Sequence, residues 1–140
     1  MNILIINGPN LNLLGKRDTD IYGNETFDDY YLKLKEEFNT LSIDYFQSNV
    51  EGELINKLQQ ADGNYNAVIM NAGGYTHTSV AIGDAVEAID TSVIEVHISN
   101  IFAREEFRHI SYISAHAKGI IAGLGLDVYR LAILHITSNQ

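Results

Sequence analysis

A glutamate and a histidine stand two residues apart in an otherwise apolar segment, 93–97. Side chains two apart in a strand point to the same face, so we expect Glu95 and His97 to lie side by side. Burying a carboxylate and an imidazole is costly unless they pair, and the carboxylate then fixes the tautomer of the imidazole and raises its basicity. The spacing predicts an acid–base pair, with a purely structural ion pair as the alternative.

Two polar loops follow other predicted strands. Residues 7–23 form a long connection, since strand-to-helix loops commonly have about 2 to 6 residues and longer ones often bind ligands. Residues 71–79 contain two glycines, which allow a close approach of the backbone to a ligand, and begin with Asn71, whose amide should face a crevice. The alternatives are a solvated asparagine turn for the first loop, and a glycine turn with a surface histidine, His77, for the second.

Two arginines follow the predicted strand that carries Glu95. Arg104 and Arg108 are four residues apart, so in a helical turn they would project side by side. The planar guanidinium group is well suited to binding carboxylates. The pair therefore indicates an anion site, unless Glu105 and Glu106 neutralise it in a surface network.

The sequence argues against bound metals and cofactors. His77, His97 and Glu95 make a conceivable metal site, but no H-E-x-x-H or comparable spacing is present. The two glycine motifs that bind phosphate groups, G-x-G-x-x-G and G-x-x-x-x-G-K-[ST], are both absent after the first predicted strand. The chain has no cysteine, which excludes disulfides, thiolate nucleophiles and iron–sulfur clusters. We expect no cofactor and no metal.

Length and charge limit the architecture and the partners. The 140 residues, 46% of them hydrophobic, predict a single domain over 1–140. A net charge of -9 disfavours nucleic acids and anionic membranes as partners. The start lacks the pattern of a signal peptide, and no apolar run approaches the roughly 20 residues of a membrane span, so we expect a cytoplasmic protein.

Apolar strand patterns alternate with helical patterns along the whole chain. The predicted strands are Ile3–Ile6, Ser42–Gln47, Ala67–Met70, Val93–His97 and Gly119–Ala122, and the predicted helices are Phe27–Leu41, Glu51–Ala61, Ser79–Ile89 and Leu126–Ile136. This alternation predicts an α/β fold, a three-layer, doubly wound sheet of five parallel strands in the order 2-1-3-4-5. Ligands of such sheets bind at the carboxyl ends of the strands, here near the first and third.

Taken together, the motifs resemble type II 3-dehydroquinate dehydratase, in register from Ile3 to about Leu134. The segments that carry the resemblance are Asn7–Gly15, Ile21–Gly23, Gln47–Asn49, Glu51–Ile55, Asn71–Ser79, Ile94–Asn100, Ala103–Arg108 and Gly123–Gly125. The resemblance implies a flavodoxin-like fold, a carbon–oxygen lyase of the shikimate pathway that leads to chorismate and the aromatic amino acids, no cofactor or metal, and a dodecamer built from trimers.

The resemblance also implies roles for individual residues. Tyr22 corresponds to the base, His97 to the general acid and Arg17 to the cation that lowers the tyrosine pKa. Asn10 corresponds to the residue that positions a water near the enolate oxygen, and Glu95 orients His97. The residues implied in substrate binding are Asn71, His77, Asp84, Arg108 and the backbone at Ile98 and Ser99.

The chain departs from the family pattern at a few positions. Gly83 stands where an arginine often precedes Asp84, and Phe102 replaces a common histidine. The segment Asp18-Thr19-Asp20 stands where the family usually has Glu-Pro. The implied reaction is the anti elimination of water from 3-dehydroquinate, a small anionic cyclic hydroxy-ketone, through an enolate to 3-dehydroshikimate. The alternative is a non-catalytic, flavodoxin-like module that binds a small molecule or nucleotide.

Overall fold

The computed structural model describes residues 1–16 and 24–138, and five parallel strands form its central sheet. The strands are β1 (Asn2–Asn7), β2 (Ser42–Gln47), β3 (Ala67–Asn71), β4 (Ser92–His97) and β5 (Gly119–Ala122). Their order is β2-β1-β3-β4-β5. The predicted number, direction and order of the strands are confirmed.

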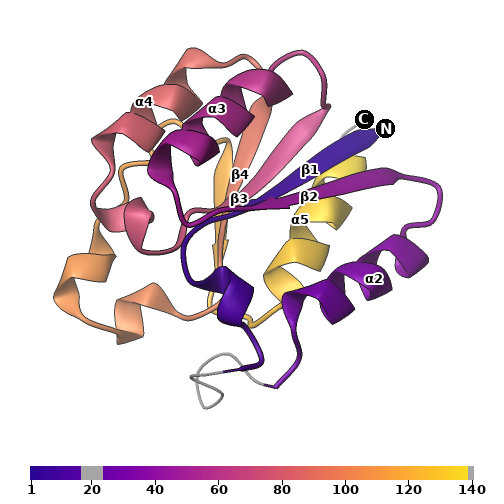
Figure 1. Ribbon diagram of the computed structural model, residues 1–140, viewed down its shortest axis with the longest axis horizontal. Coiled ribbons are helices and arrows are strands. Elements are labelled where there is room, and N and C mark those ends of the chain that lie inside the picture. Colours follow the sequence, from indigo (N-terminus) through magenta and orange to yellow (C-terminus); the bar gives the residue numbers. More distant parts are fainter. Residues whose placement is uncertain (17–23, 139–140) are drawn as a thin grey trace.

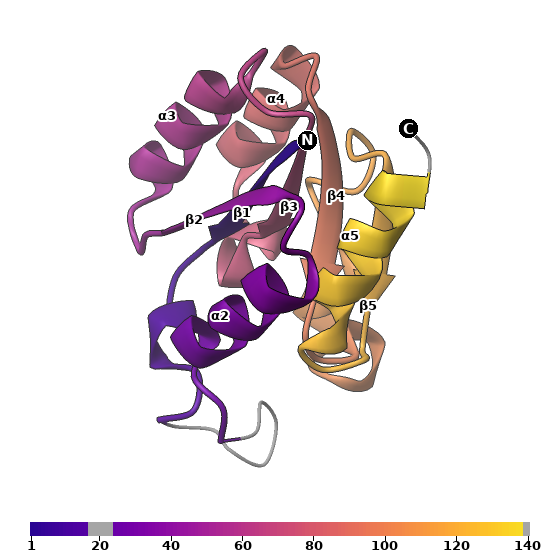
Figure 2. The same ribbon diagram turned by 90° about the vertical axis from the view of Figure 1, so that its right-hand side faces the viewer.

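Helices cover both faces of the sheet. They are α2 (Phe27–Glu37), α3 (Glu51–Ala61), α4 (Val80–Ala88) and α5 (Asp127–Ser138). Helices α3 and α4 lie on one face and α2 and α5 on the other, which gives three layers (Figures 1 and 2). Within the described ranges, none of these helices combines the length and the apolar character needed to cross a membrane.

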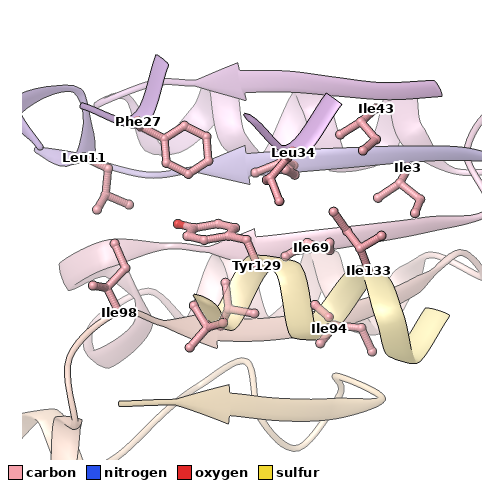
Figure 3. Close-up of a cluster of buried hydrophobic side chains, with 14 of the residues drawn as sticks. Ile3, Leu11, Phe27, Leu34, Ile43, Ile69, Ile94, Ile98, Tyr129 and Ile133 are labelled. Carbon is pink, nitrogen blue, oxygen red and sulfur yellow. The ribbon is translucent and has the colours of Figure 1, made fainter. Parts of the chain in front are cut away.

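Two apolar cores hold the layers together. Ile3 and Ile5 of β1 pack toward α2 and α5, whereas the alternate residues Leu4 and Ile6 pack toward α3 and α4. Figure 3 shows the first core, in which Tyr129 of α5 lies among the aliphatic side chains. Because both faces of a central strand are buried, its sequence is apolar without alternation. Full burial of one such side chain contributes about 1.5–3 kcal/mol.

One predicted boundary is wrong. The helix that begins at Phe27 was expected to reach Leu41 but ends at Glu37. The side chain of Thr26 caps its start by accepting a hydrogen bond from the Asp29 amide at 3.2 Å. At the other end, Phe38 leaves the helical conformation, with φ -107° and ψ 52°, and the chain turns directly into β2. Apolar periodicity marks the buried face of a helix but not the residue at which its backbone turns away.

The turns at the carboxyl ends of β1 and β3 are packed closely against each other. A Cβ atom on Gly8 would lie 2.5 Å from the backbone oxygen of Ala72, so only glycine fits at this crossing. Asn10 has a positive φ of 69°, a conformation in which asparagine is several-fold enriched among non-glycine residues. These contacts bring the two loops to one edge of the sheet.

Candidate active site

A cavity of about 300 Å³ opens at the carboxyl ends of β1, β3 and β4. Its position is the one expected for a doubly wound sheet, where the order of the strands reverses. The predicted site residues that line it are Asn10, Asn71, His77, His97, Ile98, Ser99 and Arg108. The cavity thus gathers polar groups from three strands and the loops that follow them.

The side chains of Glu95 and His97 form a buried pair beside this cavity. The Nε2 atom of His97 is hydrogen-bonded to Oε2 of Glu95. The hydroxyl of Ser111 donates to both carboxylate oxygens, at 3.1 and 3.0 Å, and that of Ser114 donates to Oε1 at 2.7 Å. Burial raises the pKa of Glu95, but the contacts with His97 and the two serines outweigh it and hold the pKa below its usual value. Glu95 is therefore an ionised, fully bonded carboxylate.

A second histidine lies against the first. His77 ends the 3₁₀ turn η2 (Gly73–His77), and its ring stacks on that of His97 with the centroids 6.1 Å apart. Its Nδ1 atom lies 2.7 Å from the backbone oxygen of Ile110. Burial lowers the pKa of His77, the bond to Ile110 opposes this shift, and weaker electrostatic effects of His97 and Arg108 add to the lowering. His77 is thus held as a neutral imidazole near neutral pH.

Asn71 is held in place by a buried hydrogen-bond network on the face of the sheet opposite to that of Glu95. Its Nδ2 atom donates to the hydroxyl of Tyr129 at 3.0 Å, and that hydroxyl donates to Oδ1 of Asn7 at 2.8 Å. Its Oδ1 atom accepts a hydrogen bond from the Gly73 amide at 3.1 Å. Burial strongly raises the pKa of Tyr129, so its phenol stays protonated. These bonds use one of the two amide hydrogens of Asn71, which leaves the other for a ligand.

Arg104 and Arg108 both line the cavity, although not on one helix. Arg104 directly follows one short 3₁₀ turn, η3 (Ile101–Ala103), and Arg108 lies in the next, η4 (Glu106–His109), so the two do not share a helical turn as the sequence suggested. Glu105 bridges them, with its carboxylate 3.6 Å from Nε of Arg104 and 3.1 Å from Nε of Arg108. Two guanidinium groups against one carboxylate leave local positive charge at the cavity of an acidic chain.

Comparisons with known proteins agree with this geometry. The family model described as dehydroquinase class II matches residues 1–137. The chain belongs to this family. The 3-dehydroquinate dehydratase of Clostridium botulinum is 49% identical over 99% of this chain and 95% of its own length. The catabolic 3-dehydroquinase of Emericella nidulans is 49% identical over 99% and 92%. The crystal structure of a type II dehydroquinase from Butyrivibrio crossotus superposes with a TM-score of 0.92 at 44% identity, covering 98% of this chain and 97% of that one.

For three of the site residues predicted for this class II dehydroquinase, the structure does not show a place at the cavity. Asp84 is exposed on α4 and is not among the residues that line the cavity. Arg17 and Tyr22 lie outside the described residues.

The sequence did not reveal three residues that hold predicted site residues in place by hydrogen bonds. Ser111 and Ser114 bind Glu95, and Tyr129 binds Asn71. The serines precede β5 in a segment with no periodic pattern, and Tyr129 resembles an ordinary apolar residue of a helix. The only pattern in the sequence that could have indicated the serines is that they are three residues apart, on either side of the apolar Ile113.

Proposed function

We propose that this chain is a 3-dehydroquinate dehydratase, which removes water from 3-dehydroquinate by anti elimination through an enolate and yields 3-dehydroshikimate. The observation that carries the proposal is the buried pair of Glu95 and His97 at the edge of a cavity that also holds two arginines. Its relatives from Clostridium botulinum and Emericella nidulans bear names of this activity. A nucleotide-binding module, the alternative from the sequence, leaves this pair without a task.

The reaction needs a base that removes a proton beside the ketone. Tyr22 is proposed as this base on the strength of the family resemblance. A free tyrosine has a pKa of about 10, so a nearby cation must favour the tyrosinate, and Arg17 is proposed for that role. Leu13 and Leu14 line the cavity and come just before Arg17 in the chain.

The departing hydroxyl needs an acid, and His97 is proposed for it. The Glu95 carboxylate accepts the Nε2 hydrogen of His97 and stabilises the imidazolium form, so Nδ1 is the nitrogen that can donate to the leaving group. A positioned general acid typically contributes about 100- to 10,000-fold to the rate. His97→Asn should lower kcat by that order while the fold persists.

The remaining predicted residues are proposed to bind the substrate. Asn71 and the backbone amides of Ile98 and Ser99 would hold its carboxylate, and His77 and Arg108 its hydroxyl groups. Asn10 would position a water at the enolate oxygen. Asp84 lies away from the cavity of its own chain, so its proposed role requires a contact between subunits.

The assembly, pathway and location are proposals as well. A single catalytic domain over 1–140 is proposed to form a dodecamer of trimers. Three large apolar side chains near the cavity support self-association, since Phe102, Phe107 and Ile110 are 66%, 58% and 63% exposed. Light scattering gives the mass of the assembly. A place in the shikimate pathway and a cytoplasmic location stay predictions, which complementation of an auxotroph and cell fractionation test.

The decisive experiment adds 3-dehydroquinate to the purified protein and follows the conjugated enone by ultraviolet absorbance. The proposal predicts turnover without added cofactor, and severe losses of kcat in Tyr22→Phe and Arg17→Ala. No lysine takes part, so borohydride added with substrate should not inactivate the protein. A lysine adduct, or near-normal turnover in Tyr22→Phe, would contradict the mechanism.

A further inference from the structure

One short segment, 110–114, contacts both histidine systems of the cavity. The backbone oxygen of Ile110 faces Nδ1 of His77, and the hydroxyls of Ser111 and Ser114 both donate to Glu95. This segment connects η4 to β5 and lies beside α4. A single stretch of chain therefore touches the partners of both imidazoles.

The segment is firmly anchored. The side chain of Ile113 is fully buried in the core beneath α3 and α4. The Tyr112 amide donates to the backbone oxygen of Thr76 at 2.9 Å, one residue before His77. A Cβ atom on Gly83 would lie 2.3 Å from the backbone oxygen of Tyr112, so the glycine allows α4 and the segment to touch.

The hydrogen bonds of Ser111 have only one arrangement. Its oxygen accepts from the amides of Ile113 and Ser114, both at 3.1 Å, which uses its two lone pairs. Its hydrogen is therefore directed to the Glu95 carboxylate. Ser114 adds a shorter bond, of 2.7 Å, to Oε1 of the same group.

These contacts settle which nitrogen of each imidazole carries hydrogen. A backbone oxygen only accepts, so Nδ1 of His77 is the donor and its Nε2 is the acceptor in the neutral ring. An ionised carboxylate also only accepts, so Nε2 of His97 carries hydrogen and Nδ1 is the nitrogen that exchanges a proton. If Glu95 were protonated, the hydrogen bond would reverse and His97 would present a neutral, weakly acidic N–H.

We infer that Ser111 and Ser114 are positioning residues, which keep Glu95 a carboxylate and so keep His97 in the tautomer and charge state that suit a general acid. This inference rests on the proposed function for its catalytic consequence, but the hydrogen-bonding part stands on the geometry alone. Neither serine lines the cavity, so neither is expected to bind the substrate.

The serines are expected to control the titration of Glu95, which has both acidic and basic groups around it. His97 shares its strand, His77 comes from η2, and the guanidinium groups of Arg104 and Arg108 face the same cavity. On the side of α4, the solvent-facing groups are Asp84 and the pair of Glu87 and His116, 3.8 Å apart. None of these groups is altered by substitution of a serine, so a change in the Glu95 titration reports the lost hydroxyl.

The test compares Ser114→Ala and Ser111→Ala with Ser114→Thr, which keeps a hydroxyl, and with Ser42→Ala, an exposed serine at the opposite end of the sheet. Carboxyl ¹³C resonances of Glu95 are followed against pH, and kcat and KM for 3-dehydroquinate are measured. A hydrogen bond to a charged group corresponds to about tenfold or more, so the Glu95 midpoint should rise by about one pH unit. The acid side of the kcat–pH profile should move upward with it, so kcat measured within that pH range should fall, by up to about tenfold. KM should change little.

Ser114→Ala is the cleaner variant, because the Ser111 hydroxyl also binds two backbone amides and its loss can disturb the turn. Ser114→Thr should recover most of the kcat, and Ser42→Ala should match the wild type. An unmoved Glu95 midpoint in Ser114→Ala would overturn the inference. If the wild type fails to dehydrate 3-dehydroquinate, the proposed function fails, while the Glu95 titration still decides whether the serines position this carboxylate.

Discussion

Two buried polar clusters lie at the carboxyl end of the sheet, one on each face, and they differ in charge. On the side of α2 and α5, the Tyr129 hydroxyl joins Asn7 and Asn71 in a neutral network. On the side of α3 and α4, Glu95 accepts hydrogen bonds from His97 and two serines. Both clusters are buried, and one residue of each lines the cavity, Asn71 in the first and His97 in the second.

The difference shows how burial serves two purposes. In the neutral cluster, the bonds from Asn71 to Tyr129 and from Tyr129 to Asn7 hold Asn71 in a fixed orientation without a charged group. Nδ2 of Asn7 has no hydrogen-bond partner of normal geometry among the described residues. A charged cluster must supply enough donors to offset the desolvation of the carboxylate, and its state then depends on pH. The first cluster should therefore govern geometry, and the second should govern proton transfer.

The largest expected effect comes from removing the charge of the second cluster. In Glu95→Gln the neutral amide no longer stabilises the His97 imidazolium, so kcat should fall by about 100-fold or more. Steady-state kinetics with 3-dehydroquinate measure it, and circular dichroism checks the fold. A kcat close to that of the wild type would mean that the two clusters do not differ in function.

A smaller effect is expected from the neutral cluster. Tyr129→Phe leaves buried polar atoms of Asn7 and Asn71 without their partner, which should lower the free energy of unfolding by about 1–3 kcal/mol. Urea denaturation measures this loss. Tyr65→Phe makes the same chemical change at an exposed hydrogen bond to Asp44 and should cost less. The Glu95 midpoint should stay in place in Tyr129→Phe, and its movement would show that the clusters are coupled.

The two clusters should also separate in acid. The pKa of Glu95 is lower in the folded chain than its usual value of 4.5, so its ionisation stabilises the fold above about pH 4.5. That contribution is lost as the pH falls through the lowered pKa. In a series of urea denaturations between about pH 7 and 3, Tyr129→Phe should retain this acid-dependent loss, whereas Glu95→Gln should lack the Glu95 part of it. Parallel curves for both variants would contradict the assignment.

The smallest effect is expected outside both clusters. Glu105 bridges the two cavity arginines, but its side chain is 50% exposed, and exposed ion pairs contribute little to stability. Glu105→Gln should leave the melting temperature unchanged and lower KM for the anionic substrate modestly, by an amount that shrinks with added salt. Glu106→Gln changes the net charge equally and serves as the control. Equal effects of the two variants would mean that the bridge itself does not matter.

Much of the site follows from local pattern. The two-residue spacing of Glu95 and His97 within an apolar strand predicted a shared face, and the structure places them in contact. Parallel strands bring their carboxyl ends to one edge of the sheet, so the sequence alone could assign the loops after β1, β3 and β4 to one site. Helix ends, such as that of α2 at Glu37, could not, because they depend on where the chain must turn.

The sequence alone determined the alternation of strands and helices and the family, because apolar periodicity and motif spacing are properties of neighbouring residues. The strand order was predicted as the usual one for such an alternation, and only the pairing of distant strands in the sheet decided it. Only the tertiary structure decided that Ser111 and Ser114 bind Glu95 and that Tyr129 binds Asn71. These partners are separated by 16, 19 and 58 positions in the chain. Contacts of that kind arise when packed elements exclude water and each buried polar atom must find a partner, a condition that no local pattern records.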